Sequence, residues 1–86
     1  MMSYSLALKP SLEKDFRSLP KTIILRVVKR IIALQDDPTP PQAIKLTGME
    51  TMYRIRVGDY RIIYELDDDT IVVHYVRHRR DAYRQL

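Results

Sequence analysis

The sequence predicts an α+β domain in which one mainly antiparallel sheet carries an antiparallel helical hairpin on one face. Apolar residues between positions 11 and 34 recur at the helical period, whereas those from position 52 onward alternate with a period of two. A shorter alternating segment precedes the helices. The expected order is therefore β-α-α-β-β-β, followed by a short C-terminal helix or tail, and such an order packs as one sheet with its helices together.

The length and composition limit the kinds of protein this chain can be. With 86 residues, the core is close to the smallest that folds alone, so we expect one domain over residues 1–86. The chain has no cysteine, which excludes a disulfide framework and a thiolate zinc site. It shows no secretory signal pattern and no apolar run of about 18 residues, so we expect a cytoplasmic protein.

The first strand is expected at residues 4–8, where a weak alternation ends at Lys9-Pro10. Ser11 is of a type that caps helices, and Leu12, Phe16 and Leu19 follow at helical spacing. These residues predict a first helix that ends before Pro20.

A second helix is predicted from Pro20, placed in its first turn, to Leu34. Its apolar stripe consists of Ile23, Ile24, Val27, Val28, Ile31, Ile32 and Leu34, and its other face carries Arg26, Lys29 and Arg30. The proline-rich run 36–41 ends it. Because the connection at Pro20 is so short, the two helices should form a hairpin.

A β-hairpin is predicted from Met52–Val57 and Tyr60–Leu66, joined by a two-residue turn at Gly58-Asp59. This turn pairs residue 57 with 60, 56 with 61, 54 with 63 and 53 with 64. Residues 67–70 form a second turn, which leads into a last strand at 71–76.

The alternation divides this hairpin into an apolar and a basic side. The apolar side consists of Tyr53, Ile55, Val57, Tyr60, Ile62, Tyr64 and Leu66. The other side displays Arg54, Arg56 and Arg61, and like charges facing each other across strands destabilise a sheet. We therefore predict an anion site here. The alternative is a solvated face on which arginine stems cover apolar neighbours and Glu65 serves as counter-ion.

The distribution of charge favours a phosphate-bearing partner. The net charge is +4, and residues 44–86 carry seven of the ten arginines but one of the five lysines. Arginine is the side chain whose planar fork binds phosphate in two places. The basic residues downstream of the hairpin are Arg77, Arg79, Arg80 and Arg84. The natural polyanion is a nucleic-acid backbone.

Other chemistries find little support in the sequence. His74 and His78 have no further ligand at metal-binding spacing, so no metal site is expected. Glycine occurs only at positions 48 and 58, so no phosphate-binding loop can be built, and no cofactor is expected. We expect His74 to be a packed or edge residue. His78, among arginines, is placed where a histidine could move protons.

Three segments of the chain form a combined pattern: Lys45-Leu46-x-Gly48, the stretch YRIRVGDYRIIY at residues 53–64, and His78-Arg79-Arg80-x-x-Tyr83-Arg84. Together they resemble the RelE/ParE superfamily of type II toxin-antitoxin toxins. The resemblance covers nearly the whole chain, including the element order and the proline-bearing loop before Lys45. Members of the RelE branch are ribosome-dependent endonucleases that cut A-site codons of mRNA by attack of the RNA's own 2′-hydroxyl. The resemblance implies that activity, with the 70S ribosome and mRNA as partners and a cognate antitoxin that folds over the basic site.

The resemblance also implies roles for individual residues. Arg54 and Arg56 match two basic residues that are lysines in the best-known member, Arg61 and Arg79 match phosphate-binding arginines, and Tyr83 matches a C-terminal tyrosine. Further RNA contacts are expected from Lys45, Arg77, Arg80 and Arg84. A guanidinium is a poor general base because its pKa exceeds about 12. We therefore expect Arg54 and Arg56 to stabilise charge on the phosphorane and the leaving group. Tyr83 and His78 are the candidate bases. Tyr83 could instead stack on a base or pack in the tail.

Two other functions stay open. A ParE-like protein would inhibit DNA gyrase by binding and would not cut RNA. A DNA-binding module built on the helical hairpin is the third possibility, but Ile24, Val28 and Ile31 of the second helix are needed in the core, and base-reading side chains are not evident.

Overall fold

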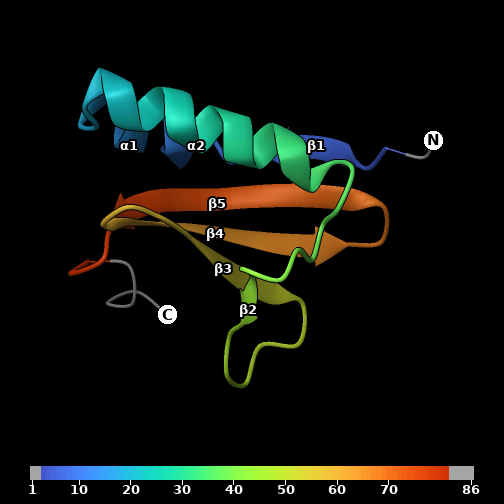
Figure 1. The fold of residues 1–86 in the computed structure, drawn as a ribbon. Helices are drawn as coiled ribbons and strands as arrows, with labels where there is room; N and C mark the ends of the chain where they lie inside the picture. The colour runs from blue at the N-terminus through green and yellow to red at the C-terminus, as the bar shows by residue number, and fades with distance from the viewer. Residues whose placement is uncertain (1–2, 82–86) are drawn as a thin grey trace.

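The computed structural model describes residues 3–81 and has two helices on one face of a five-stranded sheet (Figure 1). The elements are β1 Ser5–Leu8, α1 Ser11–Arg17, α2 Lys21–Leu34, β2 Ile44–Lys45, β3 Met52–Val57, β4 Tyr60–Asp67 and β5 Thr70–His78. The strand order is β1-β5-β4-β3-β2. The predicted α+β class and helical layer are confirmed.

The sheet contains one parallel pair and one strand that the sequence did not predict. β1 runs parallel to β5, from Ser5↔Thr70 to Leu8↔Val73, and the other pairs are antiparallel. β2 pairs with β3 only at Ile44↔Arg54 and Lys45↔Tyr53. A two-residue strand is too short to show alternation, which is why its sequence gave no signal.

The β3–β4 hairpin has the predicted register, with Val57↔Tyr60 and Arg56↔Arg61 next to the turn. Gly58 has a φ of +58°, whereas Asp59 is not among the described residues with positive φ. A positive φ at the first central position alone is the requirement of a type II′ turn, which glycine meets without steric cost. The turn thus fixes the faces of both strands.

A β-bulge shifts the pairing between β4 and β5. Ile63 pairs with Tyr75 and Tyr64 pairs with Val73, which leaves His74 without a partner on β4. After this extra residue, the side chains of β5 point to the opposite faces from those that simple alternation would give. Val73 and Val76 consequently both lie in the core on the helix side, while Tyr75 belongs to a cluster on the other face.

Two predictions about the helix starts are wrong. Ser11 makes no capping hydrogen bond, because Pro10 already has helical torsion angles and occupies the N-cap position. Pro20 lies outside the first turn of α2; it is the N-cap, with an extended ψ of 146°. Its carbonyl oxygen accepts hydrogen bonds from the N–H groups of Ile23 and Ile24, both at 3.0 Å.

The main core lies between the helices and the sheet. The core includes Leu12, Val27, Ile31, Leu34, Ile55, Ile62, Tyr64, Ile71 and Val76. Tyr64 is fully buried, its hydroxyl donates to the Pro38 carbonyl oxygen at 2.7 Å, and its ring stacks on Tyr53. Burial, aided by Tyr53 and Asp37, raises the pKa of Tyr64 well above its ordinary value. Within residues 3–81 no helix is long and apolar enough to cross a membrane.

Candidate functional site

The sheet face turned away from the helices, called here the open face, carries a line of three arginines. Arg56 on β3, Arg61 on β4 and Arg77 on β5 are successive cross-strand partners, and we call them the arginine row. Strands lie about 4.8 Å apart, so the row places three guanidinium groups across a short width of sheet. A small apolar cluster of Met52, Ile63 and Tyr75, with Leu46 packed on it, lies on the same face.

Arg61 is held at the hairpin turn. The residue is only 8% exposed, and its Nη1 donates to the carbonyl oxygens of Tyr60 at 3.1 Å and Gly58 at 3.3 Å. These bonds use one side of the planar fork and leave the other nitrogens for a ligand. Among residues 3–81, neither Arg56 nor Arg61 forms an ion pair with a carboxylate. The pair therefore carries positive charge that the described protein does not neutralise.

Two neighbours within residues 3–81, Tyr75 and Asp15, help to position Arg77. Its guanidinium carbon lies 4.2 Å above the centre of the Tyr75 ring, and its Nε is 3.7 Å from Oδ1 of Asp15. Oδ2 of the same aspartate accepts the Val76 backbone N–H at 3.2 Å. Asp15 thus joins α1 to β5 and partly offsets the charge of Arg77.

Glu65 does not serve as counter-ion to the row. Its carboxylate accepts hydrogen bonds from His74 Nε2 at 3.0 Å and from the Thr51 hydroxyl at 3.3 Å. The part of the alternative in which Glu65 neutralises these arginines is therefore wrong. His74 lies two residues after Val72, the cross-strand partner of Glu65, so its side chain falls on the same face and within reach of that carboxylate. The sequence indicated His74 only as a packed or edge residue, and this contact with Glu65 was missed.

Two further predicted residues lie next to the row. Arg54 is half-buried on the open face, opposite Ile63 on β4 and Ile44 on β2. The backbone N–H of Arg79 donates to the Asp59 carbonyl oxygen at 2.7 Å, so Arg79 lies at the turn that also holds Arg61. Arg54, Arg56, Arg61 and Arg79 are thereby gathered around one hairpin. Arg80 follows Arg79 and is exposed.

His78 lies on the other side of the sheet. It pairs with Tyr60 and meets that ring edge-on, with centroids 5.4 Å apart, on the face toward the helices. Its Nδ1 accepts the backbone N–H of Arg80 at 3.2 Å. Because the bulge reverses the phase of β5, His78 is not beside Arg61. Its imidazole must move before it can reach a ligand on the open face.

Lys45 does not join this group. Lys45 is exposed and pairs with Tyr53, so it points to the helix side of the sheet at the β2 edge. Tyr83 and Arg84 lie outside the described residues. Within residues 3–81 there is no group of three or more histidine or acidic side chains that could hold a metal ion.

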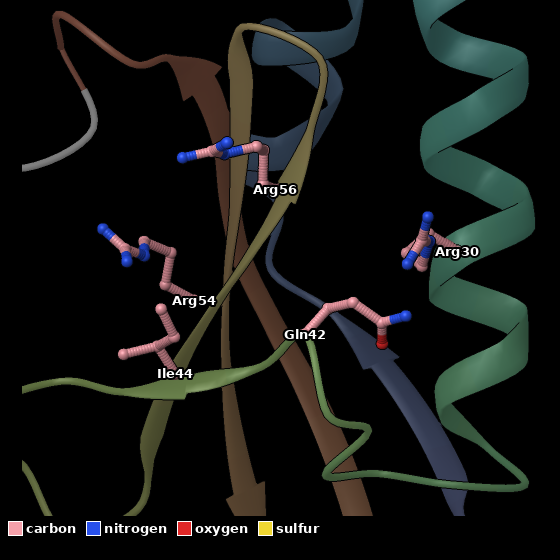
Figure 2. A pocket seen from close by; sticks show the side chains of 5 residues that line it. All are labelled: Arg30, Gln42, Ile44, Arg54 and Arg56. Atoms are coloured by element: carbon pink, nitrogen blue, oxygen red, sulfur yellow. The ribbon is translucent and has the colours of Figure 1, made fainter.

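Three basic residues of α2 were not among the predicted site residues, although the sequence placed them on one helix face. Arg30 lines a cavity of about 290 Å³ together with Gln42, Ile44, Arg54 and Arg56 (Figure 2). A neighbouring cavity of about 240 Å³ is lined by Arg26, Lys29, Arg30 and Val57. The helix face alone could not show that these side chains lie beside β3.

The chain is similar to known toxins over nearly its whole length. Residues 6–83 match the family model described as the ParE toxin of the type II toxin-antitoxin system parDE. Toxin RelG of Mycobacterium tuberculosis is 31% identical over 90 residues, covering 98% of this chain and all of that protein. The RelE–RelB complex of Pyrococcus horikoshii has a TM-score of 0.80 at 32% identity, with 94% of this chain and 100% of that chain covered. The RelB–RelE complex of Methanococcus jannaschii has a TM-score of 0.79 at 30% identity, with coverage of 93% and 98%.

Proposed function

Because the chain belongs to the RelE/ParE family of type II toxin-antitoxin toxins, we propose that it is a ribosome-dependent endonuclease that cuts mRNA codons in the A site. The observation that carries this proposal is the Arg56–Arg61 pair on the open face, with Arg54 and Arg79 beside it. The positive charges of Arg56 and Arg61 repel each other when no ligand is bound, and a negatively charged ligand would relieve that repulsion. A scissile phosphate has that charge, and arginine forks match its geometry.

In the proposed reaction the RNA supplies its own nucleophile. The 2′-oxygen attacks the adjacent phosphorus and loses its proton to a base, and the bond from phosphorus to the 5′-oxygen breaks as that oxygen gains a proton. The products are a 2′,3′-cyclic phosphate and a free 5′-hydroxyl. Arg61 and Arg79 would hold the phosphate oxygens, while Arg54 and Arg56 would stabilise the phosphorane and the leaving oxygen.

The general base is the part of this mechanism that differs from a lysine-based site. Guanidinium groups do not release protons at neutral pH, so the arginines act by charge alone. Tyr83 and His78 are the two candidates. For His78, the hydrogen bond from the Arg80 N–H to Nδ1 has to break before that nitrogen can accept a proton. Positioning of the codon by the ribosome would supply further acceleration, because fixed orientation can lower a barrier by about 7–11 kcal/mol.

The proposal includes three partners and a location. The 70S ribosome and its mRNA are the substrate assembly, which places the activity in the cytoplasm. A cognate antitoxin is the third partner, and the Pyrococcus horikoshii and Methanococcus jannaschii structures named above are complexes with RelB. A segment that folds on the toxin and carries acidic residues would cover the arginine row and neutralise it.

The test is in vitro translation of a defined mRNA, with cleavage mapped by primer extension. Wild-type protein is compared with the double variant Arg61→Ala, Arg79→Ala and with a control, Lys9→Ala, Lys14→Ala, which removes the same charge at exposed positions near the opposite edge of the sheet. We expect ribosome-dependent cuts by the wild type and control, and none by the arginine variant. Intact mRNA with folded wild-type protein would count against the nuclease.

A second function is favoured by one observation, the match to a family model described as ParE toxin. In that case the chain would inhibit DNA gyrase without cutting RNA. A supercoiling assay separates the two: inhibition of gyrase by protein that leaves translated mRNA intact supports the ParE-like function.

A further inference from the structure

The outer edge of β3 is bordered by a groove with a strongly basic lining. In the described residues β2 pairs with β3 only as far as Arg54, so β3 has no strand on its outer side from Ile55 to Val57. The cavities of about 290 Å³ and 240 Å³ lie along this edge and share Arg30. Figure 2 shows Arg30 on α2 to one side of β3 and Arg54 and Arg56 on the other, with Gln42 between them. We call this the edge groove.

The charges of the edge groove are all of one sign. Its basic side chains are Arg26, Lys29, Arg30, Arg54 and Arg56. Neither cavity has an aspartate or glutamate in its lining, and among residues 3–81 no ion pair is formed by Arg26, Lys29 or Arg30. Cations gathered along a concave surface raise the local concentration of anions. The edge groove is thus built to hold negative charge.

The spacing of these side chains fits a chain of repeated charges better than one small ion. Arg26 and Arg30 are four residues apart on a helix, which separates them by about 6 Å along its axis. Arg54 and Arg56 are two residues apart on a strand, a separation of about 6.7 Å. Two nearly equal intervals on opposite walls suit a polymer with one charge per unit, such as a nucleic-acid strand.

The edge groove is continuous with the arginine row. Arg56 belongs to both. At the other end, Nη1 of Arg26 lies 3.4 Å from the position a Cβ on Gly58 would occupy, and the Gly58 carbonyl oxygen accepts the Arg61 Nη1 hydrogen bond. One strand could therefore pass from the open face around the β3 edge to α2 without leaving basic surface.

We propose that the edge groove is a second phosphate-binding track, which holds single-stranded RNA next to the nucleotides bound by the arginine row. This proposal rests on the proposed function for the identity of the polyanion. An acidic peptide fits less well, because a peptide strand added to a sheet edge gains specificity from side-chain pockets, and the apolar lining here is limited to Ile44 and Val57. The Gln42 amide adds a donor and an acceptor suited to phosphate and ribose.

Fluorescence anisotropy of the full chain with two single-stranded RNAs, of about 4 and about 12 nucleotides, tests the track over a range of salt. The variant Arg26→Gln, Arg30→Gln removes two contacts and the control Lys9→Gln, Lys14→Gln removes equal charge elsewhere. Each phosphate contact on a single strand adds about 0.7 to the slope of log affinity against log salt, so the variant should lose about 1.4 with the long RNA. If the wild type and the variant bind the long RNA with the same affinity at 1 M salt, this difference in slope makes the variant's affinity about 25-fold lower at 0.1 M salt.

The control should keep the wild-type slope, and the short RNA should bind all three proteins alike. Because Arg26 also lies next to the Gly58 turn, Arg30→Gln alone provides a second measurement with a slope loss of about 0.7. If the slope of log affinity against log salt is the same for the wild type and the variants, the proposed track is wrong. It is also wrong if the wild type binds the short and the long RNA with equal affinity. The proposed track would also be wrong if the arginine variant lost binding to a glutamate-rich peptide but kept the RNA binding of the wild type. That result would assign the groove to a peptide.

The outcome is independent of the cleavage assay. If slopes are equal but the wild type still cuts mRNA on ribosomes, the track is wrong and the endonuclease stands. If the slopes differ as expected but mRNA stays intact, the track stands and the endonuclease is wrong.

Discussion

Arg56 and Arg61 are direct partners across the β3–β4 hairpin, so two positive side chains leave the open face side by side. Residues in this relationship have Cβ atoms about 4.5–5.5 Å apart. Arg61 is buried and bonded to carbonyl oxygens of the turn, whereas Arg56 is exposed. The pair is therefore a source of repulsion within the fold that a bound phosphate would relieve.

Replacing Arg56 with glutamine should raise stability and weaken RNA binding. The change removes the cross-strand repulsion, which is worth about 0.2–1 kcal/mol. We expect a higher urea midpoint for Arg56→Gln, with the gain largest at low salt because screening reduces the repulsion. Lys14→Gln, an equal change of charge at an exposed site on α1, is the control and should leave the midpoint within about 0.5 kcal/mol. A lower midpoint for Arg56→Gln would show that Arg56 contributes contacts that outweigh the repulsion.

Arg61→Lys should abolish most of the cleavage while retaining the fold. Lysine keeps the positive charge but has no planar fork, so it cannot bond the turn carbonyls and a phosphate together. Losing one well-placed donor to a charged transition state typically lowers turnover about 10²–10³-fold. Single-turnover cleavage on programmed ribosomes measures this, with circular dichroism to verify folding. Cleavage within about threefold of wild type would mean that Arg61 acts as a point charge only.

The hairpin and its faces could be predicted because two local rules agree there. The Gly58-Asp59 turn fixes the register, and alternation then assigns Tyr53 and Ile55 to the core and Arg54 to the open face. Neither rule needs information from distant residues. The gathering of Arg54, Arg56 and Arg61 followed directly from them.

The sequence could not show features that depend on tertiary contacts. The bulge at His74 adds one residue to β5. The residues before His74 (71–73) and after it (75–76) are all apolar, so the sequence shows no alternation of polar and apolar residues that the extra residue could interrupt. That residue decides which face His78 occupies. Likewise, the spacing of Arg26 and Arg30 places them on one side of α2, but only the packing of that helix brings them to the β3 edge.

Tyr64→Phe should destabilise the protein at neutral pH. The substitution removes the hydrogen bond to the Pro38 carbonyl oxygen and leaves that acceptor without this partner, at a cost of about 1–3 kcal/mol. Urea unfolding at pH 7 measures the change. An unchanged midpoint would mean that water replaces the phenol as donor to Pro38.

The same residue predicts a loss of stability in alkali. Burial raises the pKa of Tyr64 in the folded state above the value near 10 of an unfolded chain. The unfolded state therefore loses its proton first, and stability that is fully present below pH 10 falls above it, by at most about 1.4 kcal/mol per pH unit. In urea unfolding between pH 9 and 11.5, Tyr64→Phe should show a shallower fall than wild type. Parallel curves would contradict the assignment of this titration to Tyr64.

Asp15 should stabilise the fold more by accepting a hydrogen bond than by its negative charge. Its Oδ2 receives the Val76 N–H in a side chain that is 14% exposed, whereas Oδ1 is a longer 3.7 Å from Arg77 Nε. Asp15→Ala leaves the N–H without this partner and should cost about 1–3 kcal/mol. Asp15→Asn keeps a carbonyl oxygen for the N–H and loses only the ion pair, so its cost should stay below about 1 kcal/mol.

Urea midpoints of the two variants, with Asp36→Asn as an exposed control, test this order. Asp15→Asn also removes a negative charge beside the arginine row, so it should bind RNA more tightly than wild type at low salt even though it is slightly less stable. If Asn proves as destabilising as Ala, the carboxylate charge is what joins α1 to β5. The tighter RNA binding would then be measured at a temperature where both proteins are fully folded.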